Sequence, residues 1–224
     1  MVSPPTSSQA ALRSAFEALR GDLIHADGPR ISTMRSYRFA LLQYDPAVEY
    51  ELREEVSHLS RDLVASGWYV LPISLQRLLH DRVKKLGPRF LASVTAMEKA
   101  KARQSPDDAL DYLKNKLEPL IEGTGLSTGT PGDKGLAGDI AAVIARYADG
   151  YPERVERTLA LVGRVGALYP FFRVSALLRH LDGHTRNVPV VILYPGARDP
   201  ASPNALSFMG VTPSDSDYRP RIYP

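Results

Sequence analysis

The chain reads Val188-Pro189-Val190-Val191-Ile192-Leu193-Tyr194 near its carboxyl end, and this stretch decides the fold. Its apolar residues are nearly continuous, which is typical of a parallel strand that is covered on both faces. Three earlier runs are of the same kind: Phe39-Ala40-Leu41-Leu42, Trp68-Tyr69-Val70-Leu71 and Thr158-Leu159-Ala160-Leu161-Val162. Each run is flanked by helical patterns, so we expect a doubly wound, Rossmann-like α/β fold with a mostly parallel sheet of about four to five strands.

Helical signals fill the intervals between these runs. Asp45-Pro46 supplies a capping carboxylate and a proline at the first helical position, and apolar residues then recur at helical spacing as far as Gly67. Ser105-Pro106-Asp107-Asp108 begins a later helix, with acidic residues where the helix dipole favours them. We expect four regions: an N-terminal helical segment at 1–30, an α/β domain at 31–224, a helical insertion within it at about 90–150, and a proline-rich tail at about 203–224 that forms a short edge strand or wraps the domain.

Composition narrows the class of protein. The 224 residues are 44% apolar and 24% charged, enough for one sizeable core. Cysteine is absent, which excludes disulfides, thiolate metal sites and cysteine nucleophiles. No signal sequence or membrane-length apolar stretch occurs, so we expect a soluble, cytoplasmic protein. The formal charge of +3 does not by itself indicate a nucleic-acid surface, because the lysines are interleaved with acidic residues as on solvated helix faces.

Two segments partly match motifs for phosphate or metal binding. Residues 123–135 are rich in glycine and threonine, but Gly135 follows Lys134 where a phosphate-binding loop needs serine or threonine, and a helix lies upstream. His180 and His184 have the spacing of zinc ligands on a helix, but Gly183 separates them and no glutamate follows the first histidine. We therefore expect a loop and surface histidines, with no metal, no cofactor and no catalytic residue.

The turn Gly163-Arg164-Val165-Gly166 joins the third strand to a helix that we expect to hold Pro170 in its first turn. Such a turn either presents backbone N–H groups to an anion or is only a tight connection. Arg173 opposes the dipole of that helix and so needs a partner. We predict a structural ion pair between Arg173 and Asp45, with an anion site at the turn as the alternative.

The fourth strand is followed by residues that suit an interface. Tyr194-Pro195-Gly196 should end the strand, since Pro195 lacks a ladder donor and Gly196 permits a turn. Tyr218 and Arg219 belong to an aromatic and basic tail. Exposed aromatic and arginine side chains are common in protein interfaces, so we expect a partner surface here, with a tail packed across the sheet as the alternative.

These segments together resemble a known family. The blocks Leu161–Leu178, Val188–Gly196 and Asp217–Pro220 are similar, in order and spacing, to the carboxyl half of BrxB proteins of BREX (bacteriophage exclusion) systems. Upstream, Gln43-Tyr44-Asp45-Pro46 and Glu51-Leu52-Arg53 resemble the first strand and helix of that family. Arg164 departs from the pattern, in which a smaller residue is expected.

The resemblance implies a small, non-enzymatic component of a system that methylates host DNA and blocks phage replication. The expected partners are other BREX proteins, above all the phosphatase-like PglZ, with nucleic acid contacted only through the complex. A homodimer formed through the helical insertion is a further alternative. The candidates for binding a partner or ligand are Gly163, Gly166, Tyr169, Arg173, Tyr194, Gly196, Tyr218 and Arg219, and the expected structural residues are Asp45, Pro46, Pro170 and Pro195.

Overall fold

The computed structural model describes residues 6–26, 28–31, 38–123, 133–199, 202–212 and 220–224. Its strands are β1 (Phe39–Tyr44), β2 (Tyr69–Ser74), β3 (Thr158–Gly163), β4 (Val190–Asp199), β5 (Ser202–Phe208) and β6 (Arg221–Tyr223). Its α-helices are α1 (Ser7–Leu23), α2 (Glu49–Ala65), α3 (Leu75–Lys85), α4 (Gly87–Ala102), α5 (Pro106–Glu122), α6 (Gly135–Gly150) and α7 (Val174–Leu181). Short 3-10 helices are η1 (Pro46–Val48), η2 (Pro152–Arg157) and η3 (Gly166–Leu168).

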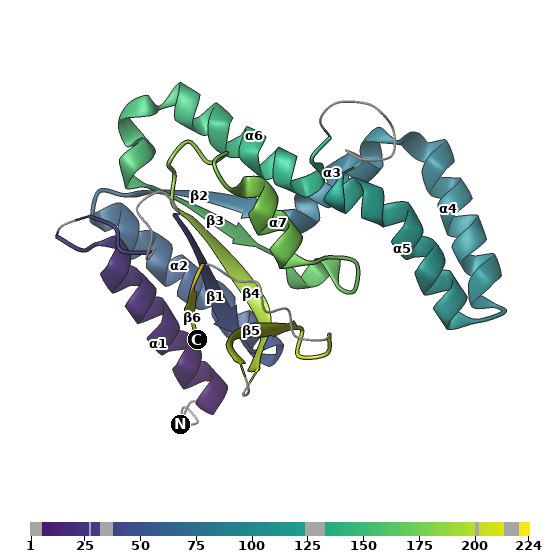
Figure 1. The fold of residues 1–224 in the computed structure, drawn as a ribbon, viewed down its shortest axis with the longest axis horizontal. Helices are drawn as coiled ribbons and strands as arrows, with labels where there is room; N and C mark the ends of the chain where they lie inside the picture. Colours follow the sequence, from purple (N-terminus) through teal and green to yellow (C-terminus); the bar gives the residue numbers. More distant parts are fainter. Residues whose placement is uncertain (1–5, 27, 32–37, 124–132, 200–201, 213–219) are drawn as a thin grey trace.

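The sheet has the order β2-β3-β4-β1-β6, and β5 pairs antiparallel with β4 (Figure 1). The other pairings in the sheet are parallel, as the apolar runs predict. The chain crosses from β1 to β2 in one direction and returns through β3 to β4 in the other. Helices therefore cover both faces, which confirms the doubly wound α/β architecture.

Each apolar run contributes to two cores because successive side chains of a strand point to opposite faces. Phe39 and Leu41 of β1 belong to the core beneath α6 and α7, whereas Ala40 and Leu42 belong to the core beneath α1 and α2. β4 divides in the same way. β2 departs from the expectation of a fully covered strand: it lies at the edge of the sheet, and much of it is exposed.

Local signals set the helix ends. Asp45 accepts a hydrogen bond from the Ala47 N–H and so caps η1, which leads into α2. Ser105 caps α5 in the expected way, and Gly67 follows α2 with a φ of 78°. α1 begins at a capping box formed by Thr6 and Gln9. Caps of this kind satisfy N–H groups that a helix end leaves unpaired.

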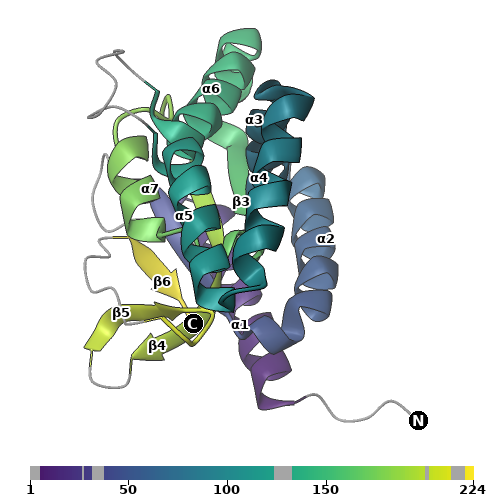
Figure 2. The ribbon, with the colours of Figure 1, turned by 90° about the vertical axis from the view of Figure 1, so that its right-hand side faces the viewer.

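The predicted insertion divides into two parts. α6 packs on the sheet as the crossover helix before β3, whereas α4 and α5 form an antiparallel hairpin that extends away from the sheet (Figures 1 and 2). The proline-rich tail forms two strands, the antiparallel β5 and the edge strand β6. Tyr223 of β6 donates a hydrogen bond to Asp22 at the end of α1, 2.8 Å away, so the two ends of the described chain are joined.

Candidate functional site

A crevice lies where the strand order reverses, at the carboxyl ends of β1, β3 and β4. Its volume is about 240 Å³. The lining residues come from β1 and β4, from the segments that follow β1 and β3, and from the turn after β5: Tyr44, Pro46, Glu49, Arg164, Gly166, Ala167, Pro195 and Met209. Proteins with open α/β sheets bind ligands at this position, so the topology makes the crevice a candidate ligand-binding site.

The Glu49 carboxylate interacts with two other residues that line this crevice. It accepts a hydrogen bond from the Tyr44 hydroxyl at 2.5 Å and pairs with the Arg164 guanidinium at 3.3 Å. Burial, and then the bond to Glu49, raise the pKa of the Tyr44 hydroxyl far above its ordinary value of 10.0. Tyr44 is therefore a fixed donor. An incoming anion would have to compete with the Glu49 carboxylate for Arg164.

Arg164 and Gly166 of the turn Gly163–Gly166 line the crevice, but Gly166 has a packing role. Arg164 adopts a φ of 60°, and a Cβ on Gly166 would lie 3.2 Å from Pro195 and 3.3 Å from Met209. The glycine thus lets η3 approach the end of β4 closely. This packing accounts for Gly166 without a bound ligand.

The predicted ion pair between Arg173 and Asp45 is wrong. Asp45 accepts hydrogen bonds from the Ala47 N–H and the Ser8 hydroxyl, each at 2.9 Å, on the face covered by α1 and α2. Arg173 precedes α7 on the other face, with no capping bond from its side chain, and lines a small recess with Glu122 and His180. The two residues follow strands whose connections leave toward opposite faces. Arg173 also lies outside the crevice, so it does not join the glycine turn in one anion site.

The segment before α7 also differs from expectation. The Tyr169–Pro170 peptide bond is cis, and the helix begins only at Val174, so Pro170 lies before the helix and not in its first turn. Tyr169 is 37% exposed, and its ring centroid lies 6.1 Å from that of the buried Phe208. Tyr169 is thus the outer member of an aromatic cluster that continues inward.

Tyr194 and Gly196 are buried, whereas a partner surface would require them to be exposed. Tyr194 is 1% exposed and packs against Phe208, with ring centroids 5.7 Å apart. A Cβ on Gly196 would lie 2.2 Å from the Ser207 carbonyl oxygen, because β5 pairs with β4 at this position. Pro195 ends only the pairing with β1, and β4 continues to Asp199 as the partner of β5. Tyr218 and Arg219 lie outside the described residues.

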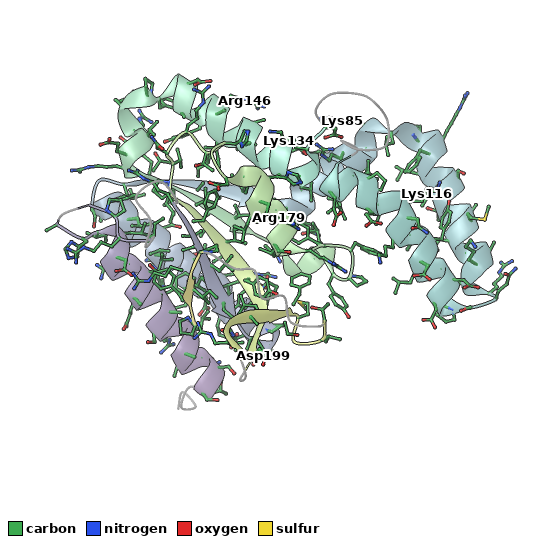
Figure 3. All side chains as sticks on the ribbon, viewed as in Figure 1. Lys85, Lys116, Lys134, Arg146, Arg179 and Asp199 are labelled. Carbon is green, nitrogen blue, oxygen red and sulfur yellow. The ribbon has the colours of Figure 1, made fainter. Side chains whose placement is uncertain are left out.

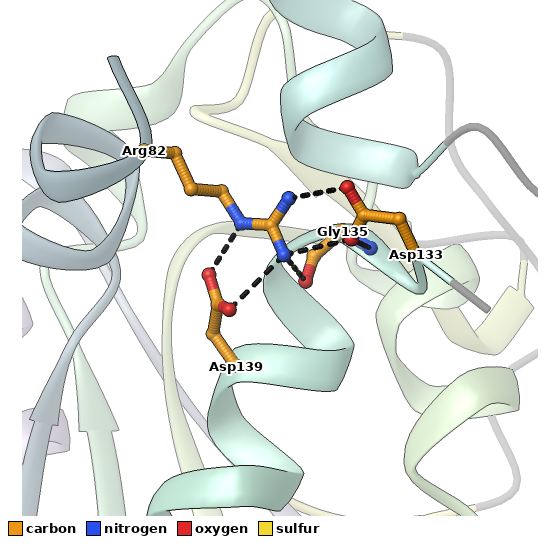
Figure 4. A network of polar contacts seen from close by, with 4 residues as sticks. All are labelled: Arg82, Asp133, Gly135 and Asp139. Carbon is orange, nitrogen blue, oxygen red and sulfur yellow. Dashed lines mark hydrogen bonds and ion pairs between the residues drawn. The ribbon is translucent and has the colours of Figure 1, made fainter. Parts of the chain in front are cut away.

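A charged cluster that the sequence patterns did not indicate joins α3 to the start of α6 (Figure 4). Arg82, 14% exposed, forms two hydrogen bonds of 2.9 Å with Asp133 and pairs with both oxygens of Asp139. It also donates to the Gly135 carbonyl at 2.7 Å. These partners lie 51 to 57 positions away in the sequence, so only their charge was visible beforehand.

The two predicted surface histidines are exposed. His180 is in α7, and His184 follows Gly183 with its Nε2 3.0 Å from the Lys134 ammonium group. Among the described residues, no group of three histidine, cysteine or acidic side chains is placed to hold a metal ion. Most of the loop at 123–135 lies outside the described residues.

The α4–α5 hairpin has the least buried surface of any long element. None of the residues of α4, all of which the structure describes, is buried. Leu91, Met97 and Leu110 are 40%, 48% and 43% exposed. Tyr112 carries two lysines over its ring, Lys101 at 6.0 Å and Lys116 at 5.6 Å. Exposed apolar side chains among charges are typical of the core and rim of a protein interface.

The fold and these sites define an α/β protein with a projecting helical hairpin. No helix in the described part of the chain has the length and apolar character needed to cross a bilayer. The family model described as "BREX protein BrxB" matches residues 71–222, which is more than half of the chain. The chain belongs to the BrxB family and is a component of a BREX phage-defence system. Searches of curated proteins and of solved structures found no match.

Proposed function

We propose that this protein is a non-catalytic adaptor of a BREX complex that binds a larger BREX protein, PglZ, through the α4–α5 hairpin. Membership of the BrxB family supports a role inside the assembly. The single observation that carries the adaptor role is the exposed apolar surface of the hairpin. Through PglZ, the adaptor would support host DNA methylation and phage exclusion without contacting DNA itself.

The hairpin suits a docking element because an ion-pair cluster holds the helix from which it starts. α3 precedes it, and the Arg82 cluster fixes α3 to α6. Leu91 and Met97 lie on α4, which extends away from the sheet (Figure 1), so a partner can reach them without displacing the core. Burying a large apolar side chain contributes about 1.5–3 kcal/mol, so a few such residues are enough for a useful affinity.

The test is an affinity pull-down of the tagged protein from its native host, with nuclease added. Wild-type protein should recover PglZ, and the double variant Leu91→Glu, Met97→Glu should not. Val64→Glu is the matched control, since Val64 is 62% exposed on α2, far from the hairpin. All three proteins should have the same thermal midpoint. Failure of the wild-type protein to recover any BREX component would refute the adaptor role.

A second candidate function, binding of a nucleotide or phosphate, is favoured by one observation, the crevice at the carboxyl ends of the strands. Glu49 opposes it, because its carboxylate already occupies Arg164. Titration calorimetry with ATP and with inorganic phosphate tests this candidate. Arg164→Ala should remove any heat of binding, whereas Arg173→Ala, in a different recess, should leave it unchanged.

A further inference from the structure

A groove runs between α3 and η3, beside the root of the α4–α5 hairpin. Its volume is about 480 Å³. Its apolar lining comes from Leu79 and Val83 of α3 and from Ala167 and Leu168 of η3. Leu79 and Val83 are one helical turn apart, so they present two adjacent apolar positions along the groove.

The outer side of α3 carries the cations Arg77 and Lys84, with His80 and the acidic Asp81 between them in the sequence. Arg77, His80 and Lys84 recur at intervals of three and four residues, which places them on one side of the helix, and the first two line the groove. Neither Arg77 nor Lys84 has an ion-pair partner within the described part of the chain. Arg82, by contrast, faces α6 and is neutralised by two carboxylates. Cations that lack ion pairs and lie beside apolar side chains favour the binding of a protein segment with acidic residues.

The neighbouring strand β2 is not suited to pair with an extended peptide of a partner. β2 lies at the edge of the sheet, where an extended peptide could pair with it. Pro72 in the middle of β2 has no N–H to donate, and prolines in edge strands prevent such pairing. The groove beside α3 is therefore better suited to a helix than to a strand.

We propose that this groove binds an acidic amphipathic helix of the partner BREX protein. The proposal rests on the adaptor function and adds a second contact surface, with its chemistry, to the hairpin. The bound helix places apolar side chains one turn apart against Leu79 and Val83. Its acidic side chains face Arg77 and Lys84, which are seven residues and about 10 Å apart along α3.

The experiment measures the affinity of the purified full-length protein for purified PglZ at low and at physiological salt. The double variant Arg77→Glu, Lys84→Glu reverses two exposed charges that have no ion-pair partner within the described residues. The matched control is Arg146→Glu, Arg179→Glu, which makes the same change of charge on α6 and α7 (Figure 3). We expect the groove variant to bind at least about tenfold more weakly at low salt, and the control less than about twofold. The difference should shrink as salt screens the charges.

A second measurement identifies the segment that occupies the groove. A photo-crosslinking amino acid is placed at position 80, and the cross-linked peptide is sequenced by mass spectrometry. A peptide of PglZ with acidic residues and apolar positions three and four apart would support the proposal. A basic or extended peptide, or one from a second copy of this chain, would overturn it.

The outcomes separate the two proposals. If the wild-type protein does not bind PglZ, the adaptor function fails and the groove proposal fails with it. If the wild-type protein binds and the groove variant binds equally well, only the groove proposal is overturned. Loss of binding by the Leu91→Glu, Met97→Glu variant with no effect of the groove variant would assign the whole interface to the hairpin.

Discussion

Arg82 of α3 pairs with both carboxylate oxygens of Asp139 in α6, and the two residues join the root of the projecting hairpin to the helix that covers the sheet. A two-point pair of this kind fixes orientation as well as distance. Asp133, just before α6, completes the coordination of the guanidinium. The Arg82 cluster therefore helps to hold the hairpin relative to the sheet, together with the apolar packing of Leu117 and Ile121 of α5 on the core.

Arg82→Met should destabilise the protein by about 2 kcal/mol, because it leaves two partly buried carboxylates without a cation. In a chain of this size the melting temperature should fall by about 4–8 °C. Arg77→Met on the exposed side of the same helix should change stability by less than about 0.5 kcal/mol. Thermal and urea unfolding measure both. Equal stability of Arg82→Met and the wild type would contradict a structural role for the cluster.

Asp133 should contribute to stability only above acid pH. The Arg82 hydrogen bond holds the pKa of the Asp133 carboxyl below its ordinary value of 3.8. As the pH falls, the Asp133 carboxyl is therefore protonated in the unfolded chain before it is protonated in the folded protein. The stabilisation by Asp133 is present above pH 3.8 and is lost as the pH falls through the pKa of the folded protein. Urea unfolding from about pH 6 to about pH 3 should show the wild type losing its advantage over Asp133→Asn. A constant difference across this range would refute the coupling.

Tyr44→Phe should alter the alkaline stability of the protein. Burial raises the pKa of the Tyr44 hydroxyl, so the unfolded chain releases this proton near pH 10.0 while the folded chain retains it. The wild type should lose stability as the pH rises above 10.0, and the variant should lose less. At neutral pH the variant should be about 1 kcal/mol less stable, because the bond to Glu49 is missing. Tyr50→Phe, at an exposed position of α2, is the control.

Gly196→Ala should be strongly destabilising, by about 3 kcal/mol, since its Cβ would overlap the Ser207 carbonyl oxygen and the Tyr194 ring. Gly21→Ala makes the same chemical change in the exposed surface of α1, where a Cβ meets nothing within 4 Å. That variant should be more stable than the wild type by up to about 1 kcal/mol. Chemical denaturation compares the two. Wild-type stability of Gly196→Ala would mean that β5 does not pair closely with β4 at Gly196.

Local patterns were sufficient to predict the strands β1 to β4 and several helix starts. The run at Val188–Tyr194 predicts a covered strand because a parallel strand in the middle of a sheet needs apolar side chains on both faces. Asp45 and Ser105 predict helix starts because a capping bond involves residues only two or three positions apart. Interactions between residues so close in the sequence can be predicted from a short sequence segment.

The candidate site was less predictable for the opposite reason. Tyr194 and Gly196 were expected at the surface, but β5 covers them, and nothing in the residues around position 194 indicates where residues 202–208 return. The Arg82 cluster joins residues more than fifty positions apart, and its charges are indistinguishable in sequence from those of a solvated helix. Arg173 was assigned the wrong partner because the face to which each connection turns is a property of the whole sheet.

The sequence by itself determined the four strands β1 to β4, most helix ends, the α/β class and the resemblance to the BrxB family, since each depends on short-range order along the chain. The tertiary structure alone decided the strand order β2-β3-β4-β1-β6, the crevice around Glu49 and Arg164, and the groove beside α3. These features arise where distant segments meet, and their stability comes from contacts that form only when the two layers of helices close on the sheet.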